Sequence, residues 1–262
     1  MKNRWTVSGK RMSVSYYDTL SSTNDEAKRL ASCGAEEGTV VVADRQTAGR
    51  GRLARNFVSP AGRGLYANIL LRPVLPPEAL PLLTVAAAVA VTEAAEAVGG
   101  IPLGIKWVND VYSREGKVSG ILVETAFSPA GDIDYAVLGV GINLFPWDER
   151  PAEAGPAASL FSVAPPEEER KRVRDALLHG VLERFFEYYL HMEEKPFLPT
   201  YRERSILTGK RVTVFSPRDK EKACPLYTAT VTGIDEEGAL CLFTDAGEEK
   251  RLTFGEVSLT KE

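Results

Sequence analysis

The sequence predicts an α+β protein of two domains: a mixed β-sheet with helices packed on one face, followed by a small SH3-like β-barrel. Three observations lead to this fold class. Apolar, β-branched segments alternate with helical segments as far as residue 193. Pro196 and Pro199 then interrupt the pattern. From Gly209 onward, short strand-like segments are separated by turns rich in Asp and Gly, which is typical of small barrels. We therefore expect domains at 1–208 and 209–262.

Local patterns predict the elements of the larger domain in order. Thr23 with Glu26 three residues later matches a capping box, so Thr23 is the expected N-cap of a helix that ends near Ser32. The predicted strands are Val14–Tyr17, Thr39–Asp44, Leu65–Leu71, Gly104–Val108, Ser119–Thr125 and Tyr135–Asn143. The further predicted helices are Pro81–Val98, which Gly99 and Gly100 terminate, and Glu167–Glu193, which carries an apolar stripe at helical spacing. Residues 146–156, rich in proline and alanine, predict a mobile surface loop.

The smaller domain is predicted from closely spaced strands within about fifty residues. These strands are Arg211–Phe215, Tyr227–Ile234, Leu240–Phe243 and Lys250–Phe254. The turns Asp235–Gly238 and Asp245–Gly247 separate three of them.

Composition restricts the class of protein. The net charge of -4, with 44% hydrophobic and 26% charged residues, is ordinary for a soluble globular chain. Its three cysteines have no zinc-ligand spacing and give no disulfide framework, so a cytoplasmic location is expected. The N-terminus lacks the apolar core of a signal peptide. Residues 80–98 contain threonine and glutamate and are rich in alanine, which favours a buried helix over a membrane span.

A local cluster of arginines is the most informative feature. Residues 45–77 contain six arginines and neither lysine nor acidic residues. At its centre, Gly49-Arg50-Gly51-Arg52-Leu53-Ala54-Arg55 combines guanidinium groups, which suit carboxylate and phosphate oxygens, with glycines that let backbone N–H groups approach a ligand. This pattern predicts a loop that binds an anion. From this segment alone, a solvated basic loop or a nucleic-acid patch is an equal alternative.

Two further motifs lie near predicted strand ends, where ligand sites are common. The first runs from Ile105 to Glu124 and contains KWVNDVY and KVSGILVE, and the second is Gly139–Leu144, GVGINL. Each has a structural explanation by itself. The polar residues could close a strand, and the glycines could allow two backbones to approach closely.

Taken together, the three motifs resemble those of the biotin protein ligases. The matching segments are Gly49–Pro73, Ile105–Glu124, Gly139–Leu144 and the short Ser21–Asn24, and the resemblance extends over roughly residues 14 to 260. The chain departs from the family pattern at Ala54, Phe57 and Val108, where glycine, tryptophan and proline are usual. The resemblance implies a class II synthetase-like sheet followed by the SH3-like barrel.

The resemblance also implies an activity. Such ligases use ATP and Mg²⁺ to convert biotin to biotinyl-5'-AMP, and then transfer biotin to a lysine of the biotin carboxyl carrier protein of acetyl-CoA carboxylase or another biotin-dependent enzyme. The resemblance implies a homodimer, because members of the family often pair side by side through their sheets, and no membrane partner is expected. No DNA partner is expected either, because the chain begins too close to the first catalytic strand to carry the DNA-binding helix-turn-helix of some relatives.

Site residues follow from the same motifs. The resemblance implies that the biotin-binding residues are Ser22, Thr23, Asn24, Gln46, Arg50, Gly51, Arg52, Lys117 and Gly120. Expected at the nucleotide are Arg52, Arg55, Trp107, Asn109 and Asn143. The expected catalytic residues are Lys117, Arg50 and Asp110, and Asp110 is also the candidate metal ligand.

Two other functions compete with this one. A lipoate or octanoate ligase or transferase would share the fold, but those families lack the GRGRxxR and KWxND patterns present here. A non-enzymatic binding module could use the arginine cluster on nucleic acid, but few aromatic residues accompany the arginines.

Overall fold

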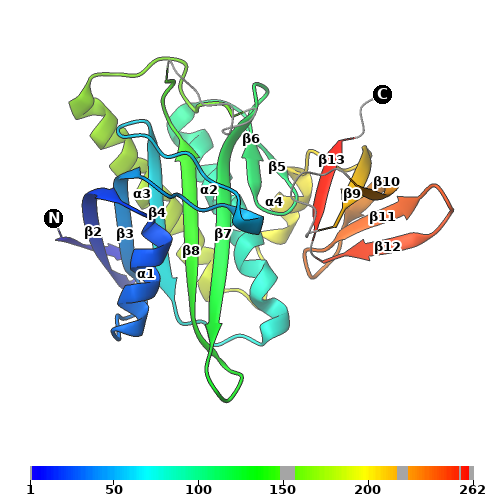
Figure 1. The fold of residues 1–262 in the computed structure, drawn as a ribbon, viewed down its shortest axis with the longest axis horizontal. Coiled ribbons are helices and arrows are strands. Elements are labelled where there is room, and N and C mark those ends of the chain that lie inside the picture. The colour runs from blue at the N-terminus through cyan, green and yellow to red at the C-terminus, as the bar shows by residue number, and fades with distance from the viewer. Residues whose placement is uncertain (1, 148–156, 217–223, 254, 260–262) are drawn as a thin grey trace.

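The computed structural model describes residues 2–147, 157–216, 224–253 and 255–259. Most of the predicted loop at 146–156 therefore lies outside the described residues. Figure 1 shows a large sheet with helices on both faces and a second, smaller sheet near the C-terminus. The large sheet has eight strands in the order β1-β2-β3-β4-β8-β7-β6-β5. They span Lys2–Val7 (β1), Lys10–Leu20 (β2), Thr39–Gln46 (β3), Gly64–Leu71 (β4), Gly104–Lys106 (β5), Asp110–Tyr112 (β6), Lys117–Phe127 (β7) and Ile133–Asn143 (β8).

The sheet is mixed, as predicted. Only β2 and β3 pair in parallel among the described strands, and all other neighbours in this sheet are antiparallel. The predicted strand Gly104–Val108 ends at Lys106 as β5, because the chain turns at residues 107–109. The next short strand, β6, was not predicted and pairs antiparallel with β5. The peptide bond between Trp107 and Val108 in this turn is cis.

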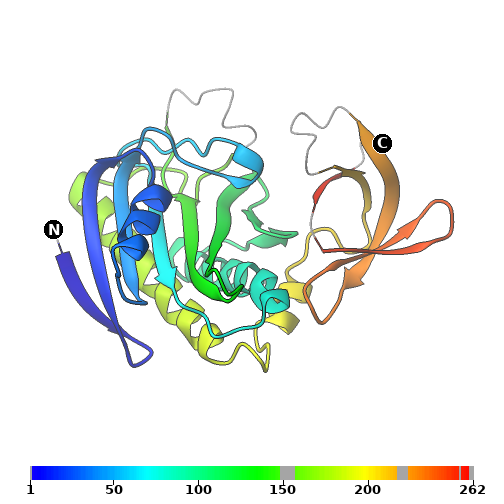
Figure 2. The same ribbon diagram turned by 60° about the horizontal axis from the view of Figure 1, so that its bottom comes forward.

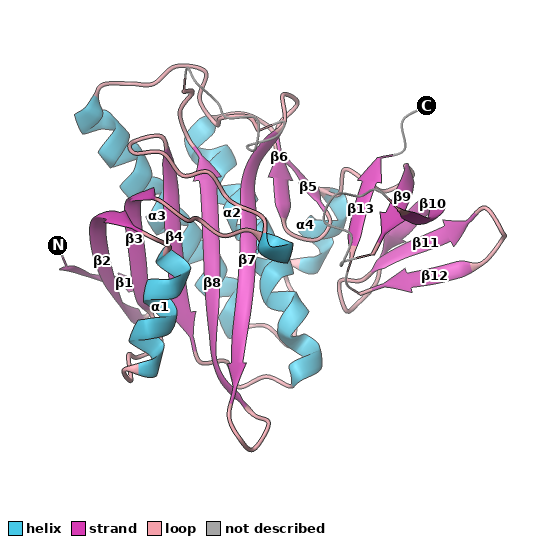
Figure 3. Cartoon of the chain, in the orientation of Figure 1, coloured by secondary structure: helices cyan, strands magenta, loops and turns pink. Residues whose placement is uncertain are grey.

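Helices cover both faces of the sheet. The long helices α2 (Leu80–Gly99) and α3 (Glu167–Leu190) pack together on one face, and α1 (Thr23–Ser32) lies on the other, as Figure 3 shows. Strand alternation explains this division, because Val40 and Val42 join the α2–α3 core while Val41 joins a separate cluster with α1. The structure thus adds one helix to the face that the sequence left open.

The apolar helix α2 is the buried helix that the sequence predicts. Residues 85–91 are fully or almost fully buried. Within the described residues, one segment, Pro77–Gly99, is long and apolar enough to cross a membrane, contrary to the expectation from its threonine and glutamate residues. In the fold, 67% of its most apolar stretch is buried. Core helices of soluble proteins pass the same test of length and composition, so this property carries little weight.

The second sheet has five strands in the order β12-β11-β10-β9-β13. Their bounds are Arg211–Phe215 (β9), Pro225–Ile234 (β10), Leu240–Thr244 (β11), Glu249–Leu252 (β12) and Glu256–Leu259 (β13). Figure 2 shows this sheet beside the short helix α4 (Leu198–Glu203). Four strands match the prediction, whereas β13, α4 and the edge strand β1 were not predicted.

One local prediction is wrong. The N-cap of α1 is Ser22, whose hydroxyl accepts a hydrogen bond from the backbone N–H of Asn24. Thr23 is the first helical residue, and its hydroxyl is hydrogen-bonded to Gln46 on β3 and Asn68 on β4 instead of capping the helix. Glu26 bonds to Arg29 and Tyr17 and does not complete a capping box.

Candidate functional site

A small pocket lies between the N-terminus of α1, the sheet and the arginine-rich segment. Residues 49–57, called here the arginine loop, fold back on themselves, since Phe57 N–H donates to the Gly49 carbonyl and Gly51 N–H to the Arg55 carbonyl. The pocket is lined by Ser22, Thr23, Asn24, Gln46, Arg50, Phe57, Asn68, Gly120, Leu122, Gly139, Val140 and Gly141. Six of the nine residues predicted to bind biotin are in this set, so segments far apart in the sequence do converge here.

One wall of the pocket is a hydrogen-bond network around Thr23. Both the backbone N–H and the hydroxyl of Thr23 lie 2.8 Å from Gln46 Oε1. The same hydroxyl is 2.6 Å from Asn68 Oδ1, and Gln46 Nε2 donates to Ser59 Oγ. The network therefore fixes the side chains of α1, β3 and β4 relative to one another.

Two amides in this wall keep unused hydrogen-bonding groups. Asn24 and Asn68 are each 3% exposed. Among the described residues, neither polar atom of the Asn24 side chain has a partner, and Asn68 Nδ2 has none either. An unpaired buried polar group costs about 1–3 kcal/mol, so such groups commonly mark the place of a missing ligand or water. The pocket can thus satisfy a ligand that carries both donors and acceptors.

Glycines and an aromatic ring shape the rest of the pocket. A Cβ atom at Gly141 would lie 2.6 Å from Phe57 Cζ, and one at Gly139 would lie 2.9 Å from Asn68 Nδ2. The rings of Phe57 and Tyr66 also pack edge-to-face, with 6.3 Å between their centroids. The remaining cavity is about 30 Å³, whereas ligand sites usually measure ~300 Å³ or more. Phe57 or the arginine loop must therefore move when a ligand of ordinary size enters.

Lys117 borders this pocket next to Gly120. Its Nζ lies 3.1 Å from the position of a Cβ atom on Gly120. The ammonium group pairs with Asp110 Oδ1 at 2.6 Å, and both side chains are partly buried. Arg50 lines the pocket, whereas Lys117 lies next to the lining residue Gly120 without lining the pocket itself, and Asp110 is reached through its ion pair with Lys117.

The predicted nucleotide-binding residues fall into two groups. Arg52 Nη1 donates to Asn109 Oδ1 at 2.9 Å. Arg52 Nη2 is 3.3 Å from the carbonyl oxygen of Gly255, which lies between β12 and β13 of the second sheet. Asn143 Nδ2 lies 3.4 Å from the Lys117 carbonyl, which places Asn143 near the ion pair of Lys117 and Asp110. Arg55 is half-buried at the end of the arginine loop.

Trp107 belongs to the second group. It is 5% exposed and its indole N–H donates to the Gly238 carbonyl at 3.0 Å. It therefore packs between the two sheets and does not line the pocket that contains Thr23.

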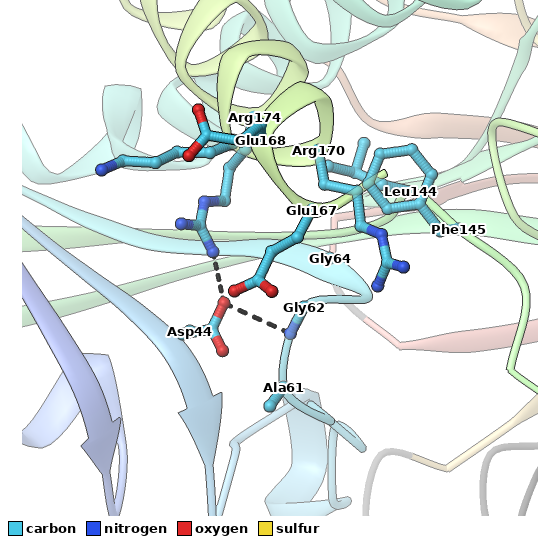
Figure 4. A pocket seen from close by; sticks show the side chains of 11 residues that line it. Asp44, Ala61, Gly62, Gly64, Leu144, Phe145, Glu167, Glu168, Arg170 and Arg174 are labelled. Atoms are coloured by element: carbon cyan, nitrogen blue, oxygen red, sulfur yellow. Dashed lines mark hydrogen bonds and ion pairs between the residues drawn. The ribbon is translucent and has the colours of Figure 1, made fainter. Parts of the chain in front are cut away.

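A larger cavity lies elsewhere, and none of the predicted site residues lines it. It measures about 600 Å³ and lies beside the first turns of α3. Figure 4 shows Asp44 in its wall, where the carboxylate accepts hydrogen bonds from Arg174 and from the backbone N–H of Gly62. Within the described residues no three His, Cys, Asp or Glu side chains form a group that could hold a metal ion.

Asn68 was missed by the sequence analysis although it lies in the pocket wall. The available signal was an amide inside an otherwise apolar strand, GLYANILL. A buried amide in such a strand needs a partner, which is an argument for a binding site.

Comparison with known proteins gives a consistent result. Residues 16–143 match the model of the Biotin/lipoate A/B protein ligase family, and residues 208–260 match the Biotin protein ligase C terminal domain. The chain is 36% identical over 239 residues to the bifunctional ligase/repressor BirA of Bacillus subtilis, covering 90% of this chain and 70% of the relative. It is 34% identical over 228 residues to the biotin–acetyl-CoA-carboxylase ligase of Mycobacterium tuberculosis, covering 84% and 79%.

Solved structures agree with these matches. The biotin protein ligase from Aquifex aeolicus in complex with biotin and ATP superposes with a TM-score of 0.72 at 31% identity, covering 95% of this chain and 99% of that one. This confirms the predicted fold class, a mixed α+β domain followed by an SH3-like β domain. Motifs, fold and relatives all agree, and the chain belongs to the biotin protein ligase family.

Proposed function

We propose that this enzyme is an ATP-dependent biotin protein ligase that forms biotinyl-5'-AMP and transfers biotin to a lysine of a biotin carboxyl carrier protein. One observation carries the choice of biotin. In the pocket that gathers most of the predicted residues, three buried amide groups have no hydrogen-bond partner among the described residues: Asn24 Oδ1, Asn24 Nδ2 and Asn68 Nδ2. The ureido ring of biotin offers two N–H donors and a carbonyl acceptor, which together match these groups.

The same observation argues against lipoate. The dithiolane ring of lipoate has no strong hydrogen-bonding group, so it would leave both polar atoms of the Asn24 side chain and Asn68 Nδ2 buried and unpaired. Sites built to hydrogen-bond a substrate reject analogues that lack the bonding group by large factors. We therefore rank the lipoate or octanoate ligase below the biotin ligase.

The cations of the pocket support the first reaction step. In that step a carboxylate oxygen attacks the α-phosphorus of ATP, the P–O bond to pyrophosphate breaks, and two anions must approach. Fixed positive groups stabilise the charge that develops there. Lys117 has three donor hydrogens, so its contact with Asp110 leaves others for the carboxylate and the phosphate. Arg50, at the same pocket, would bind the carboxylate end of biotin.

Asp110 is the protein group best placed for a magnesium ion. Mg²⁺ bound to a nucleotide often uses only one or two carboxylates together with phosphate oxygens, so a lone carboxylate fits this mode. Such an ion would neutralise charge on the phosphates. Arg52, Asn109 and Asn143, which lie near Asp110 and Lys117, would surround the nucleotide.

In the second step the acceptor lysine attacks the acyl carbon and AMP leaves. The attacking amine must lose a proton, because a charged ammonium group is not nucleophilic. The Asp110 carboxylate would accept that proton in this proposal. A homodimer and a cytoplasmic location stay predictions from the resemblance and the composition.

Exchange of labelled pyrophosphate into ATP tests the proposal. We expect exchange that depends on biotin and not on lipoate, and transfer of labelled biotin to a carrier domain. Lys117→Ala should abolish the exchange and leave the protein folded, whereas Lys210→Ala, at an exposed barrel position, should behave as the wild type. Exchange with lipoate alone would select the alternative function. Normal exchange in Lys117→Ala would remove Lys117 from the mechanism.

A further inference from the structure

An ion pair links the arginine loop to α1 across the mouth of the pocket. Arg50 Nη2 lies 2.9 Å from Asp25 Oδ1 and 3.1 Å from Asp25 Oδ2. Asp25 follows directly after Thr23 and Asn24, which line the pocket. The contact therefore joins two walls of the same site, one from a helix and one from a glycine-rich loop.

The geometry leaves most of the Arg50 guanidinium available. Among the described residues, both of its contacts are made by Nη2. A guanidinium has five donor hydrogens in a rigid plane, so holding one corner fixes the direction of the others. Nε and Nη1 can then bind an anion while Nη2 stays on Asp25.

The arginine loop is held from its other side by a different residue. Arg52 bonds to Asn109 in the turn between β5 and β6 and to the carbonyl of Gly255. Gly49 and Gly51 flank Arg50 and give the backbone of the loop conformational freedom, which the loop would lose when a ligand binds. Asp25 is the acidic group that the structure places on the α1 side of this loop.

We propose that Asp25 is a positioning residue, which orients Arg50 for the substrate carboxylate without touching the substrate. The inference rests on the proposed function. Arg50 and Asp25 side chains are 50% and 40% exposed, so the pair is weak and salt-sensitive. Its effect is to reduce the loop conformations that must be lost when the carboxylate binds.

The test compares Asp25→Ala and Asp25→Asn with Glu26→Gln. Glu26 is the next residue of α1, and its carboxylate bonds Arg29 and Tyr17 and not the loop, so this variant controls for the loss of one negative charge. Two quantities are measured: trypsin cleavage of the ligand-free protein after Arg50, Arg52 and Arg55, and KM for biotin against kcat in pyrophosphate exchange.

Asp25→Ala should be cleaved several-fold faster in the loop and should raise KM for biotin by about 3- to 10-fold, with kcat within about two-fold. Asp25→Asn keeps an acceptor oxygen and should fall between it and the wild type. Glu26→Gln should match the wild type, and the difference in KM should shrink at high salt.

Two results would overturn the role of Asp25: wild-type cleavage and KM in Asp25→Ala, or equal changes in Glu26→Gln. A wild-type protein without biotin-dependent exchange would contradict the proposed function instead. In that case the cleavage rates of the ligand-free variants still decide whether Asp25 holds the loop.

Discussion

At the scale of single residues, Asn68 shows how the ligand-free protein keeps a polar group unpaired at its pocket. Thr23 has one hydroxyl proton, yet its oxygen lies within hydrogen-bond distance of both Gln46 Oε1 and Asn68 Oδ1. The proton can serve only one of them, and the Asn68 amide keeps an unused polar atom at the pocket in any arrangement. The ligand-free protein therefore has an unsatisfied hydrogen-bonding group, which a bound ligand would satisfy.

Replacing Asn68 by leucine, which has a similar volume, separates binding from stability. We expect biotin affinity to fall about 10-fold, because a polar group of the ureido ring would be left unpaired in a buried site, which costs about 1–3 kcal/mol. The free energy of unfolding should stay the same or rise, since an unsatisfied buried amide disappears. Calorimetric titration with biotin and urea unfolding measure the two effects. Unchanged affinity would place the ureido ring elsewhere.

The sequence could predict much of the site but not its arrangement. Arg50, Gln46 and the Ser22–Asn24 segment were identifiable because their motifs are specific. The directions of the Phe57 and Trp107 side chains had no local signal in the sequence. Phe57 enters the pocket and Trp107 packs against Gly238, and both contacts depend on how the two sheets assemble. Tertiary contacts decide such orientations.

At the scale of elements, one half-buried carboxylate links the β1–β2 hairpin to α3. Glu37 accepts hydrogen bonds from Lys10, from the backbone N–H of Arg72 and from the Tyr189 hydroxyl. Burial alone would raise the pKa of Glu37, but these donors outweigh it and hold the pKa below its ordinary value of 4.5. The ionised form is thus the one that the fold stabilises.

Glu37 should therefore make stability depend on pH. Because its pKa is lower in the folded state, its contribution is complete above pH 4.5 and is lost as the pH falls through the folded pKa. At neutral pH, Glu37→Gln should lower the free energy of unfolding by about 1–3 kcal/mol. The difference from the wild type should shrink in acid. Urea unfolding across this range measures it, and a difference that is independent of pH would contradict the assignment.

Elements with strong periodicity were predictable, and short or polar ones were not. The apolar pattern identified β3, β4, β8 and α2, whereas the edge strand β1, KNRWTV, is mostly polar because little of it reaches the core. The N-cap of α1 was placed one residue late because Ser22 and Thr23 are both good caps. Gln46 and Asn68 engage the Thr23 hydroxyl, which leaves Ser22 to cap the helix.

At the scale of the whole molecule, the two sheets share one hydrophobic core. Buried residues from α2 and from the barrel strands belong to a single contiguous cluster. Gly238, in the β10–β11 turn, has φ = 76°, and a Cβ atom there would lie 2.9 Å from Val85 Cγ2. Glycine is thus required both by the backbone and by the close approach of the barrel to α2.

A pair of glycine substitutions isolates the second requirement. Gly247 has φ = 80° and open space around it, so Gly247→Ala measures the backbone strain alone. We expect Gly238→Ala to lose about 1–3 kcal/mol more than Gly247→Ala, because the added methyl group forces the barrel and α2 apart. Thermal unfolding measures the difference, and the fluorescence of Trp107 should report the displacement. Equal losses would mean that the two sheets are not tightly packed.

The glycines beneath Phe57 also constrain how this enzyme can diverge. Gly120, Gly139 and Gly141 already have the smallest possible side chain, so mutation cannot deepen that floor. Phe57 packs against Gly120 and Gly141 from a loop, where a smaller residue would enlarge the pocket without breaking the hydrogen bonds of a strand. Adaptation to a bulkier acid should consequently leave its evolutionary trace at position 57 and spare β7 and β8.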